Sequence, residues 1–593
     1  MDDHVQGYYD RIYAALSKET DLSQIAQWME KNTSHPLQPS KPWTFAGHEY
    51  QIEIVSSDAH ELAAKKCSQV GASEIFCRLL LAMMDVMPAL TALYVMPTAG
   101  MAGKFTKGRL DPIIAGSKRL RERCSKDVDS NSMKQFGNSF MHIMGSFGQT
   151  SAISTPAQAL FRDEYDFCNQ SVLTLFMSRL GHAAGGGIVR DFSTPTVPGF
   201  GIDVRYEAGS KARFAVFCRR CKEFVCPEFM QDVMIPGFDG TMFTFEKEDA
   251  SRVDIDIDEA YCQCPQCYHP LRWNDFLDTK NRQWVHEKPD VALKSYHIQP
   301  WDVPSVNSIQ KILFSVKDYE RKADWVNMKV GQAYADADNS FVQKVIDDNT
   351  NGAPVIPPSG DNMDDCTQAY QGFIMAADVG KTTSWLGVAA PVEHGYELVY
   401  TERIRQTSEN FLVKRWKFLG KYFGVVQGVI DAGPDFTSST MIAGSAPGRY
   451  WKCYYVNSDG KKLGNLQTND EESTISAFRT GCFDSTAKRV NSGFIKFRDL
   501  PDRDTLKEHL GNIKRVDQLD GNGEIVSSWQ KTGDDHYAHM LNYLNMAYDL
   551  STKAPAEVTP GVLPMTSKVR MQTGIEDGPE GWVRNQGKRP FGS

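Results

Sequence analysis

The sequence predicts a multidomain protein of the α/β class, and three observations support this prediction. The chain has 593 residues. This exceeds the size of a domain with a single hydrophobic core, so several domains are expected. Residues up to about 200 alternate helical stretches with short β-branched runs such as ALYVMP, which favours a mostly parallel sheet. A second alternation of strands and helices occupies residues 370–550. With 41% hydrophobic residues the chain can build packed cores, and we expect a soluble globular protein.

Breaker residues and changes of pattern divide the chain into six segments. We expect an N-terminal helical segment (1–41), an α/β core (42–204), a region rich in Cys, Asp and aromatic residues (205–290), a helical connector with a linker (291–360), a second α/β block (361–552) and a flexible tail (553–593). The apolar stretch 76–97 is interrupted by Arg78, Asp85 and Pro88. It therefore predicts a buried helix and strand rather than a membrane span.

Charge and cysteine content restrict the function classes. The 65 Lys and Arg residues are outnumbered by 74 Asp and Glu, and the net charge of −9 excludes a protein that holds nucleic acid by bulk positive charge alone. The 13 cysteines are an odd number, and the first residues do not form a signal-peptide pattern, so a disulfide framework is not expected. We expect a reducing cytosol, where close cysteine pairs indicate a metal.

The segment LAAKKCSQVGASEIFCRLLLAMM is the candidate for phosphate binding. A polar loop around Gly71 leads directly into an apolar helical pattern, and amide groups at a helix N-terminus bind anions. The hydroxyl of Ser73 is placed to ligate magnesium. The standard lysine position holds Ala72, so Lys65 or Lys66 must reach the phosphates from the start of the loop. The alternative is an ordinary strand-to-helix turn.

Two further strands end in polar residues. The run ALFRDEYDF ends in Asp163 and Glu164, and in ATPases the first such carboxylate holds magnesium while the second activates the attacking water. The run VRDFSTPT ends in Ser193 and Thr194, whose hydroxyls can sense a γ-phosphate. A solvated acidic loop and a plain strand-ending turn are the alternative interpretations.

The runs FCRRC and CPQC contain two C-x2-C pairs separated by 42 residues. Two such pairs supply four thiolates within tetrahedral reach, the ligand set of a structural zinc without an open coordination position. The long separation predicts an insertion between the pairs. The expected ligands are Cys218, Cys221, Cys264 and Cys267, with Cys226 and Cys262 nearby as alternative ligands.

In the second α/β block, three strands, a helix and a fourth strand predict an RNase H-like fold. Asp378 ends the first strand and Asp431 ends the fourth, and these strands are neighbours in that topology. Two close carboxylates repel each other unless a cation lies between them, so the pair favours Mg²⁺ or Mn²⁺ and cleavage of a phosphodiester. The third ligand is expected at the start of a later helix, from Asp535, Asp534 or in part His539. The alternative is that the aspartates only cap turns.

The order of KKCSQVGASE, YVMPTAGMAGKFTKGRLDPII, ALFRDEYDF and FSTPT resembles the ATPase of the large terminase subunit of tailed phages, particularly the lambda-type branch. That branch has a variant Walker A loop with its lysine at the start, where Lys66 stands. The resemblance covers most of residues 42–550. It implies a P-loop-type ATPase domain with a parallel sheet, a zinc-bearing insertion and a C-terminal RNase H-like nuclease domain.

The same resemblance implies residue roles. An adenine-contacting glutamine preceded by an aromatic residue would match Tyr50 and Gln51. The ATP-binding set is then Gln51, Lys65, Lys66, Gln69, Gly71, Ser73 and Asp163, with Ser193 and Thr194 for coupling. The catalytic set is Glu164 for ATP hydrolysis and Asp378, Asp431 and Asp535 for DNA cleavage.

The resemblance also implies a function and partners. ATP with Mg²⁺ would drive double-stranded viral DNA into a procapsid, and the nuclease would cut concatemeric DNA. The implied partners are the portal protein, a small terminase subunit and further copies of this chain, with no membrane. The expected location is the host bacterial cytoplasm, with transient docking at the portal and no secretion. The alternatives are an ATP-dependent helicase or repair nuclease, and a non-catalytic zinc-stabilised DNA-binding scaffold.

A basic stripe in residues 104–126 stands out on this acidic chain. It consists of Lys104, Lys107, Arg109, Lys118, Arg119, Arg121, Arg123 and Lys126. A DNA motor needs phosphate contacts that do not read bases, and such a stripe can supply them. The alternatives are a solvated helix face, or an arginine that acts in trans on a neighbouring subunit's ATP.

Overall fold

The computed structural model describes residues 24–36, 38–87, 89–147, 155–181, 183, 187–336, 340–358, 366–405, 410–456, 466–520 and 522–553. They form two compact units. Unit 1 comprises Met1–Phe341 with Gly511–Asp534, and unit 2 comprises Val342–Leu510 with Asp535–Ser593. The predicted tail, from its second residue on, and most of the predicted N-terminal segment lie outside the described residues. Within the described ranges, no helix has the length and apolar character needed to cross a membrane.

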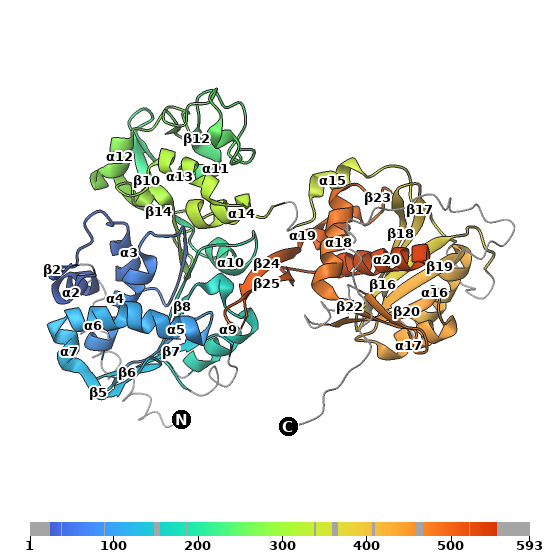
Figure 1. Ribbon diagram of the computed structural model, residues 1–593, viewed down its shortest axis with the longest axis horizontal. Helices are drawn as coiled ribbons and strands as arrows, with labels where there is room; N and C mark the ends of the chain where they lie inside the picture. Colours follow the sequence, from blue (N-terminus) through green and yellow to red (C-terminus); the bar gives the residue numbers. More distant parts are fainter. Residues whose placement is uncertain are drawn as a thin grey trace, which may run out of the picture. The chain divides into compact units, whose positions relative to one another are not determined.

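Unit 1 is built on an eleven-stranded sheet whose central strands are parallel (Figure 1). Their order is β15-β3-β9-β8-β4-β7, with β3 (Glu61–Lys66), β4 (Thr91–Met96), β7 (Ser139–Gly145), β8 (Ala159–Asp163), β9 (Ile188–Ser193) and β15 (Lys294–Ile298). Antiparallel pairs flank them, namely β5 (Cys124–Asp129) with β6 (Met133–Phe136), and β10 (Ala212–Cys218) with β11 (Glu223–Val225) and β14 (Arg282–His286). The strands predicted in ALYVMP, ALFRDEYDF and VRDFSTPT are confirmed as β4, β8 and β9.

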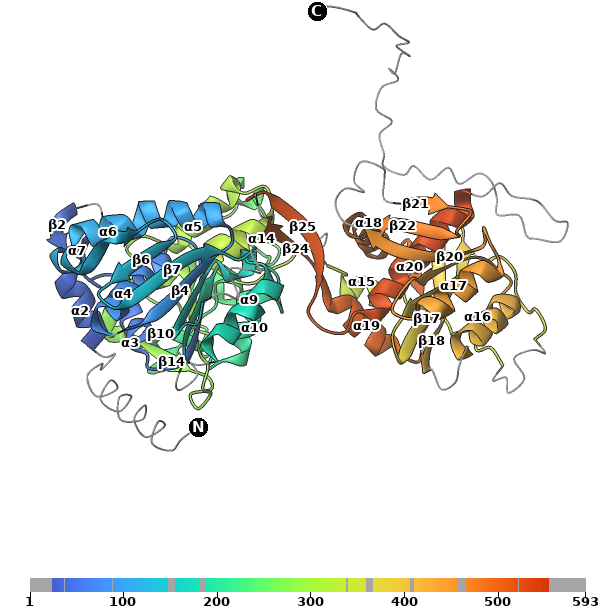
Figure 2. The same cartoon turned by 90° about the horizontal axis from the view of Figure 1, so that it is seen from below.

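Alternate residues of the central strands face opposite sides of this sheet. In β4, Tyr94 packs in the core cluster of α4 (Ala72–Val86), whereas Leu93 and Val95 pack in the cluster of α9 (Gln170–Met177). Because both faces are covered, the strands are buried almost throughout, including the charged residues near their carboxyl ends. Figure 2 shows α5, which packs on the same side of the sheet as α4, lying along β4 and β7 with α6 beside it. The remaining helices are α2 (Ile25–Asn32), α3 (Gln51–Ser56), α5 (Ala99–Phe105), α6 (Asp111–Gly116), α7 (Lys118–Arg123) and α10 (Gly201–Ala208).

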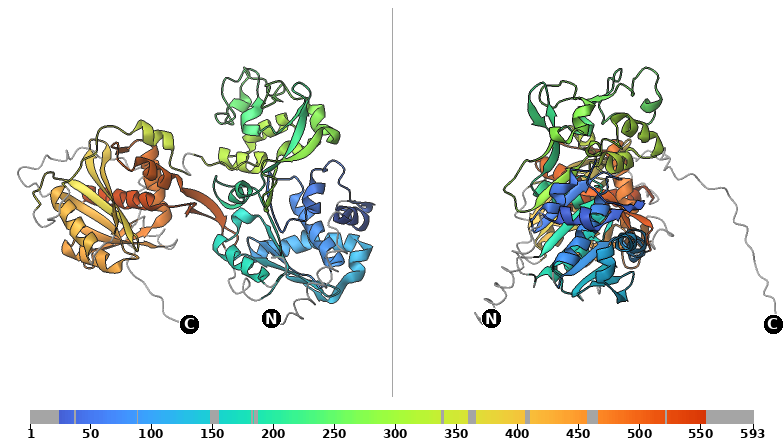
Figure 3. Two further views of the ribbon diagram at one scale, coloured as in Figure 1. Left: turned by 180° about the vertical axis from the view of Figure 1, so that it is seen from behind. Right: turned by 90° about the vertical axis from the view of Figure 1, so that its left-hand side faces the viewer.

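The α/β core extends further along the chain than predicted. The core was expected to end at residue 204, but β15 lies parallel to β3 and completes the sheet beyond the cysteine-rich region. Parallel strands need a crossover connection, and the crossover from β10 to β15 forms, together with the segment after β15, a subdomain with its own hydrophobic core. This subdomain, drawn in green, projects from the sheet in Figure 3. It includes α11 (Phe229–Asp232), β12 (Val233–Met234), β13 (Tyr261–Cys262), α12 (Trp273–Leu277), α13 (Ile309–Phe314) and α14 (Lys322–Trp325).

Unit 2 contains an eight-stranded mixed sheet in the order β21-β22-β20-β19-β16-β17-β18-β23. Its strands are β16 (Phe373–Val379), β17 (Thr383–Val392), β18 (Gly395–Arg405), β19 (Val425–Asp431), β20 (Tyr450–Val456), β21 (Leu466–Asn469), β22 (Thr474–Phe478) and β23 (Ile495–Phe497). With α16 (Phe411–Tyr422) between β18 and β19, the predicted β-β-β-α-β order is confirmed. The predicted adjacency of the first and fourth strands is also confirmed, since β16 pairs parallel with β19.

Helices cover both faces of the unit 2 sheet. On one face α16 and α17 (Phe436–Ser445) share a core with the strands. On the other face α20 (His536–Lys553) packs on β16, β17 and β19. The remaining helices are α15 (Gln343–Asp348), α18 (Arg479–Asn491) and α19 (Arg503–Gly511).

The predicted block 361–552 is interrupted by a hairpin that belongs to unit 1. The hairpin consists of β24 (Ile513–Leu519) and β25 (Ile525–Lys531). Val516 packs in a small cluster with Val197 and Phe200, and the buried Trp529 ring lies 5.6 Å from that of Phe341. Val516 and Val197 are 319 residues apart in sequence and Trp529 and Phe341 are 188 apart, so a local pattern does not reveal these contacts.

Candidate functional site

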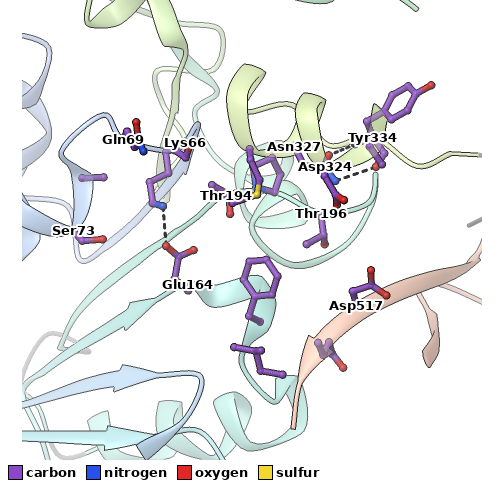
Figure 4. Close-up of a pocket in the computed structure, with 18 of the residues that line it drawn as sticks. Lys66, Gln69, Ser73, Glu164, Thr194, Thr196, Asp324, Asn327, Tyr334 and Asp517 are labelled. Carbon is purple, nitrogen blue, oxygen red and sulfur yellow. Dashed lines mark hydrogen bonds and ion pairs between the residues drawn. The ribbon is translucent and has the colours of Figure 1, made fainter. Parts of the chain in front are cut away.

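A cavity of about 660 Å³ in unit 1 brings together most of the residues predicted to bind a nucleotide (Figure 4). The predicted residues that line it are Lys66, Gln69, Gly71, Ser73, Glu164 and Thr194. They come from β3 and the following loop, the N-terminus of α4, and the ends of β8 and β9. The cavity therefore lies at the carboxyl ends of parallel strands, the usual ligand position in such sheets.

The loop between β3 and α4 has the backbone of an anion-binding loop. Gln69 and Gly71 have positive φ angles of 60° and 79°. The positive φ of Gly71 favours glycine there, and a Cβ atom at this position would also lie only 3.0 Å from Nε2 of Gln51. The loop runs into the N-terminus of the fifteen-residue helix α4, whose dipole favours an anion.

The structure separates the two candidate lysines. Lys66 lines the cavity, and its Nζ lies 3.1 Å from Oε1 of Glu164. Lys65 points to the opposite face of β3, where its Nζ lies 3.0 Å from Oδ1 of Asp203 and 4.2 Å from the centre of the Tyr206 ring. Successive side chains of a strand face opposite sides, so only one lysine can reach the cavity. The structure favours Lys66 and does not place Lys65 at the cavity.

Two adjacent carboxylates end β8 beside this lysine. Asp163 accepts hydrogen bonds from Tyr94 at 2.8 Å and from Ser73 at 3.4 Å, so it faces the predicted magnesium hydroxyl. Burial and the charge of Glu164 raise the pKa of Asp163 to about 7, against the opposing charge of Lys66. Burial would lower the pKa of Lys66, but Glu164 and Asp163 outweigh it and raise that pKa. Glu164 itself has a φ of 50°, a strained conformation that is common at active sites.

Asp166 joins the carboxylate loop to the segment after β9. Its Oδ2 accepts hydrogen bonds from the amide and the hydroxyl of Thr196, both at 2.9 Å, and its Oδ1 accepts one from the amide of Ile202 at 2.6 Å. Burial raises its pKa to about 7. The sequence analysis missed this residue, although the third acidic position of DEYD was a signal.

The predicted coupling residues take different positions. Thr194 lines the cavity, whereas Ser193 is buried and donates its hydroxyl to the carbonyl of Thr194 at 2.8 Å. The Ser193 hydroxyl also accepts a hydrogen bond from the Asp166 amide at 3.2 Å. Ser193 therefore supports the loop, and Thr194 faces the nucleotide position.

Gln51 lies behind the loop and does not line the cavity. Its Nε2 donates to the carbonyl of Val70 at 3.2 Å and to the Tyr50 hydroxyl at 3.0 Å. In this conformation Gln51 supports the loop backbone, and its contact with adenine stays a prediction.

Several further residues of the cavity wall were missed by the sequence analysis. They are charged or polar groups far from the motifs in sequence, namely Arg321, Asp324, Asn327, Tyr334, Arg515 and Asp517. Figure 4 shows Asp324, Asn327 and Tyr334 on one side and Asp517 on the strand below. No local motif marks these positions, because only the fold brings the connector and the hairpin to the loop.

The predicted cysteine set is assembled in the subdomain of unit 1. The Sγ atoms of Cys218, Cys221, Cys264 and Cys267 lie within 4.8 Å of one another, with distances of 3.7 Å for Cys218 to Cys267 and 3.9 Å for Cys221 to Cys264. A tetrahedral zinc with bonds of about 2.3 Å requires sulfur separations of about 3.8 Å, so the geometry fits. The alternative ligands Cys226 and Cys262 are not in the cluster.

The predicted nuclease carboxylates meet at the sheet of unit 2. Asp378 is the penultimate residue of β16 and Asp431 is the last residue of β19, and Ala377 pairs with Ile430 one residue before them. Burial and the charge of Asp378 raise the pKa of Asp431 to about 6. Nδ1 of His536 lies 2.8 Å from Oδ2 of Asp378. The pair has the mutual repulsion that a bound cation relieves.

The start of α20 distinguishes the candidates for the third ligand. Asp535 is buried and lies in unit 2, with an oxygen 3.2 Å from Nε2 of His539. Asp534 is exposed and belongs to unit 1. Within the described part of the chain, the cysteine cluster is the only group with three or more ligand atoms within 4.8 Å of one another. Asp378, Asp431 and Asp535 are therefore not preassembled as a closed metal site.

The basic stripe is partly neutralised by its own neighbours. Arg119 and Arg123 pair with the buried carboxylate of Asp85, at 2.5 and 3.4 Å. Arg109 lines the cavity and pairs with Glu74 at 3.5 Å. The structure therefore ties two arginines of the stripe to a buried carboxylate and places a third, Arg109, beside the cavity.

Comparison with known families identifies the N-terminal part of the chain. Residues 42–275 match the family described as phage terminase large subunit gpA, ATPase domain. This confirms the resemblance predicted from the motifs. No curated protein matches the chain.

Several solved structures are similar to parts of this chain. The HK97 bacteriophage large terminase has 9% identity and a TM-score of 0.47, covering 89% of this chain and 99% of that chain. A large terminase from a thermophilic bacteriophage, in complex with ATP-gamma-S, has 12% identity and a TM-score of 0.26, covering 82% of this chain and 94% of that chain. The large terminase nuclease of thermophilic phage G20c with bound magnesium has 17% identity and a TM-score of 0.24, covering 35% of this chain and 97% of that chain.

Proposed function

Because residues 42–275 match a terminase ATPase domain of the gpA type, we propose that this chain is the motor and nuclease subunit of a viral DNA-packaging machine. ATP hydrolysis in unit 1 drives double-stranded viral DNA into a procapsid, and unit 2 cuts concatemeric DNA. The subunit works with the portal protein, a small terminase subunit and further copies of itself. It acts in the host bacterial cytoplasm and docks transiently at the portal.

The observation that supports the ATPase role most strongly is the pairing of Lys66 with Glu164 at the cavity. Without a nucleotide, each group neutralises the other. A triphosphate attracts Lys66 through charge, and Glu164 is then free to orient the attacking water. Ser73 and Asp163 are placed to hold the magnesium ion, which neutralises charge on the phosphates.

The nuclease role is supported by the adjacent Asp378 and Asp431. One or two divalent ions, either Mg²⁺ or Mn²⁺, would activate water and stabilise the leaving oxygen there. Asp535 completes the ligand set after a side-chain rearrangement. The four clustered cysteines hold a structural zinc, which stabilises the subdomain.

Two assays on the full chain test this function. DNA-stimulated ATP hydrolysis should fall about 10²- to 10⁴-fold in Glu164→Gln, because the variant loses the general base. Cleavage of plasmid DNA with Mn²⁺ should be lost in Asp378→Ala while ATP hydrolysis persists. ATP turnover that does not respond to Glu164→Gln would contradict the motor role. Strand displacement instead of duplex translocation would favour a helicase.

A further inference from the structure

The nucleotide cavity has a wall that comes from the C-terminal half of the sequence. Arg515, Asp517, Gln518 and Leu519 of β24 and Ile525 of β25 line it together with the phosphate-binding loop. Figure 4 shows Asp517 on its strand, below Asp324 and Thr196. The hairpin belongs to unit 1, although the chain enters it from unit 2 and returns to unit 2 after it.

An arginine of the connector holds this hairpin. Arg321 contacts Oδ2 of Asp517 at 2.8 Å and Oδ1 of Asp324 at 2.7 Å, and all three residues line the cavity. A second arginine, Arg515, lies 3.7 Å from Asp517. One carboxylate of the hairpin therefore partly neutralises two cations that face a cavity suited to a polyanion.

A nucleoside triphosphate disturbs this arrangement. Its phosphates repel the carboxylates of Asp517 and Asp324, and they attract the guanidinium of Arg321 in a partly desolvated space. Arg321 is 43% exposed in its side chain, so it has room to change partner. Guanidinium groups bind phosphate oxygens with paired, charge-assisted hydrogen bonds, so the phosphate is a strong competitor for Asp517.

We propose that Arg321 is a nucleotide-binding residue that Asp517 holds back, and that nucleotide entry releases the β24–β25 hairpin from Arg321. The inference rests on the proposed ATPase function and deepens it. Binding and hairpin attachment compete for one side chain, so each weakens the other by the same factor. The attachment of the hairpin to Arg321 thus depends on whether a nucleotide occupies the cavity.

Both ends of the hairpin are connected through the chain to unit 2, so a change in the hairpin can reach that unit. The hairpin begins three residues after Leu510 and ends four residues before Asp535, which both belong to unit 2. Within unit 2 the two chain ends are joined, since the Tyr537 amide donates to Nδ1 of His509 at 3.2 Å. The preceding residue, His536, contacts Asp378 of the nuclease pair. Release of the hairpin therefore acts on the chain segment that positions the predicted nuclease ligands.

Nucleotide affinity of the full chain tests the competition. Binding of a fluorescent, non-hydrolysable ATP analogue should tighten about three- to tenfold in Asp517→Asn, since the change frees Arg321 and removes a negative charge. It should weaken by a similar factor in Arg321→Ala. A merely structural pair would not give opposite signs for its two members.

Unit 1 contains a matched control pair. Arg252 is held between Asp249 and Asp254, its side chain is also 43% exposed, and none of these residues lines the cavity. Arg252→Ala and Asp254→Asn should leave nucleotide affinity unchanged. Equal effects in the control pair would overturn the proposal.

Hydrogen exchange provides a second measurement that does not depend on a variant. Amides of residues 513–519 should exchange faster in the wild-type chain when the analogue is bound, and this acceleration should be absent in Arg321→Ala. Suppose that the wild-type chain binds the analogue, but Asp517→Asn does not tighten binding or the exchange of the hairpin amides does not change. The proposed competition for Arg321 is then wrong, and the ATPase proposal stands. If the wild-type chain binds no nucleotide, both proposals are wrong.

Discussion

The two acidic sites of the molecule balance their charge in different ways. In the nucleotide cavity, Lys66 pairs with Glu164, and Asp163 accepts hydrogen bonds from Tyr94 and Ser73. In unit 2, Asp378 and Asp431 lie on neighbouring strands, and a histidine is the group that contacts Asp378. The first site balances its carboxylates with protein partners, whereas the second brings two carboxylates together on neighbouring strands, the arrangement that we propose binds a cation from solution. Changes of side chains should therefore dominate the first site, and changes of metal and pH the second.

The largest effect is expected from the lysines of β3. Lys66→Ala should reduce ATP hydrolysis about 10³-fold, because the cavity loses the cation beside the phosphates. Lys65→Ala should instead lower the free energy of unfolding by about 3 kcal/mol, since it leaves the buried carboxylate of Asp203 without its partner. Steady-state ATP hydrolysis and denaturant unfolding measure the two effects. Loss of hydrolysis with unchanged stability in Lys65→Ala would contradict this assignment.

The nuclease pair offers the next contrast. Asp431→Asn should reduce Mn²⁺-dependent DNA cleavage about 10²- to 10³-fold, because the strand end loses a metal ligand. Asp534→Asn changes an exposed residue of unit 1 and should retain nearly full cleavage. Plasmid nicking at fixed Mn²⁺ measures both. Equal losses in the two variants would show that Asp534 is a ligand.

The raised pKa of Asp431 predicts a pH dependence of cleavage. With a pKa of about 6, this carboxyl group takes up a proton as the pH falls through 6 and then cannot bind a cation. Cleavage should fall as the pH is lowered from about one unit above this pKa to about one unit below it, and higher Mn²⁺ should shift the fall to lower pH, because metal and proton compete. A pH profile that does not move with the Mn²⁺ concentration would contradict metal binding at this pair.

The cysteine cluster should affect stability more than chemistry. The purified chain should contain one zinc ion, which Cys264→Ser loses together with several kcal/mol of subdomain stability, on the order of a structural zinc contribution. Cys226→Ser is the matched control, since this thiol is not in the cluster. Metal analysis and thermal unfolding measure both variants. Zinc retained in Cys264→Ser would exclude the four-cysteine site.

The smallest effect is expected at Asp166. Asp166→Asn should lower the free energy of unfolding by about 1–3 kcal/mol, because the amide nitrogen cannot accept the bonds that one carboxylate oxygen accepted. The variant should lower kcat more than it raises KM for ATP, since it misplaces the loop of Thr196 and Thr194. An unchanged kcat would show that Asp166 supports only the fold.

Much of the fold and of the candidate site follows from local patterns. The strands that end in Asp163, Asp378 and Asp431 are short apolar runs bounded by polar residues, and each lies where it was predicted. The two C-x2-C pairs likewise meet as expected, because their spacing already restricts how they can approach. Such features are visible because periodicity and spacing act over a few residues.

The sequence by itself determined the two alternations of strands and helices, the strand-end carboxylates and the four cysteines that cluster. Only the tertiary structure decided that Lys66 rather than Lys65 faces the cavity, that Gln51 supports the loop, and that the hairpin 511–534 joins unit 1. The first choice depends on which side of the sheet is covered, and the others on contacts between distant segments. These depend on the packing of the whole unit, so no local pattern encodes them.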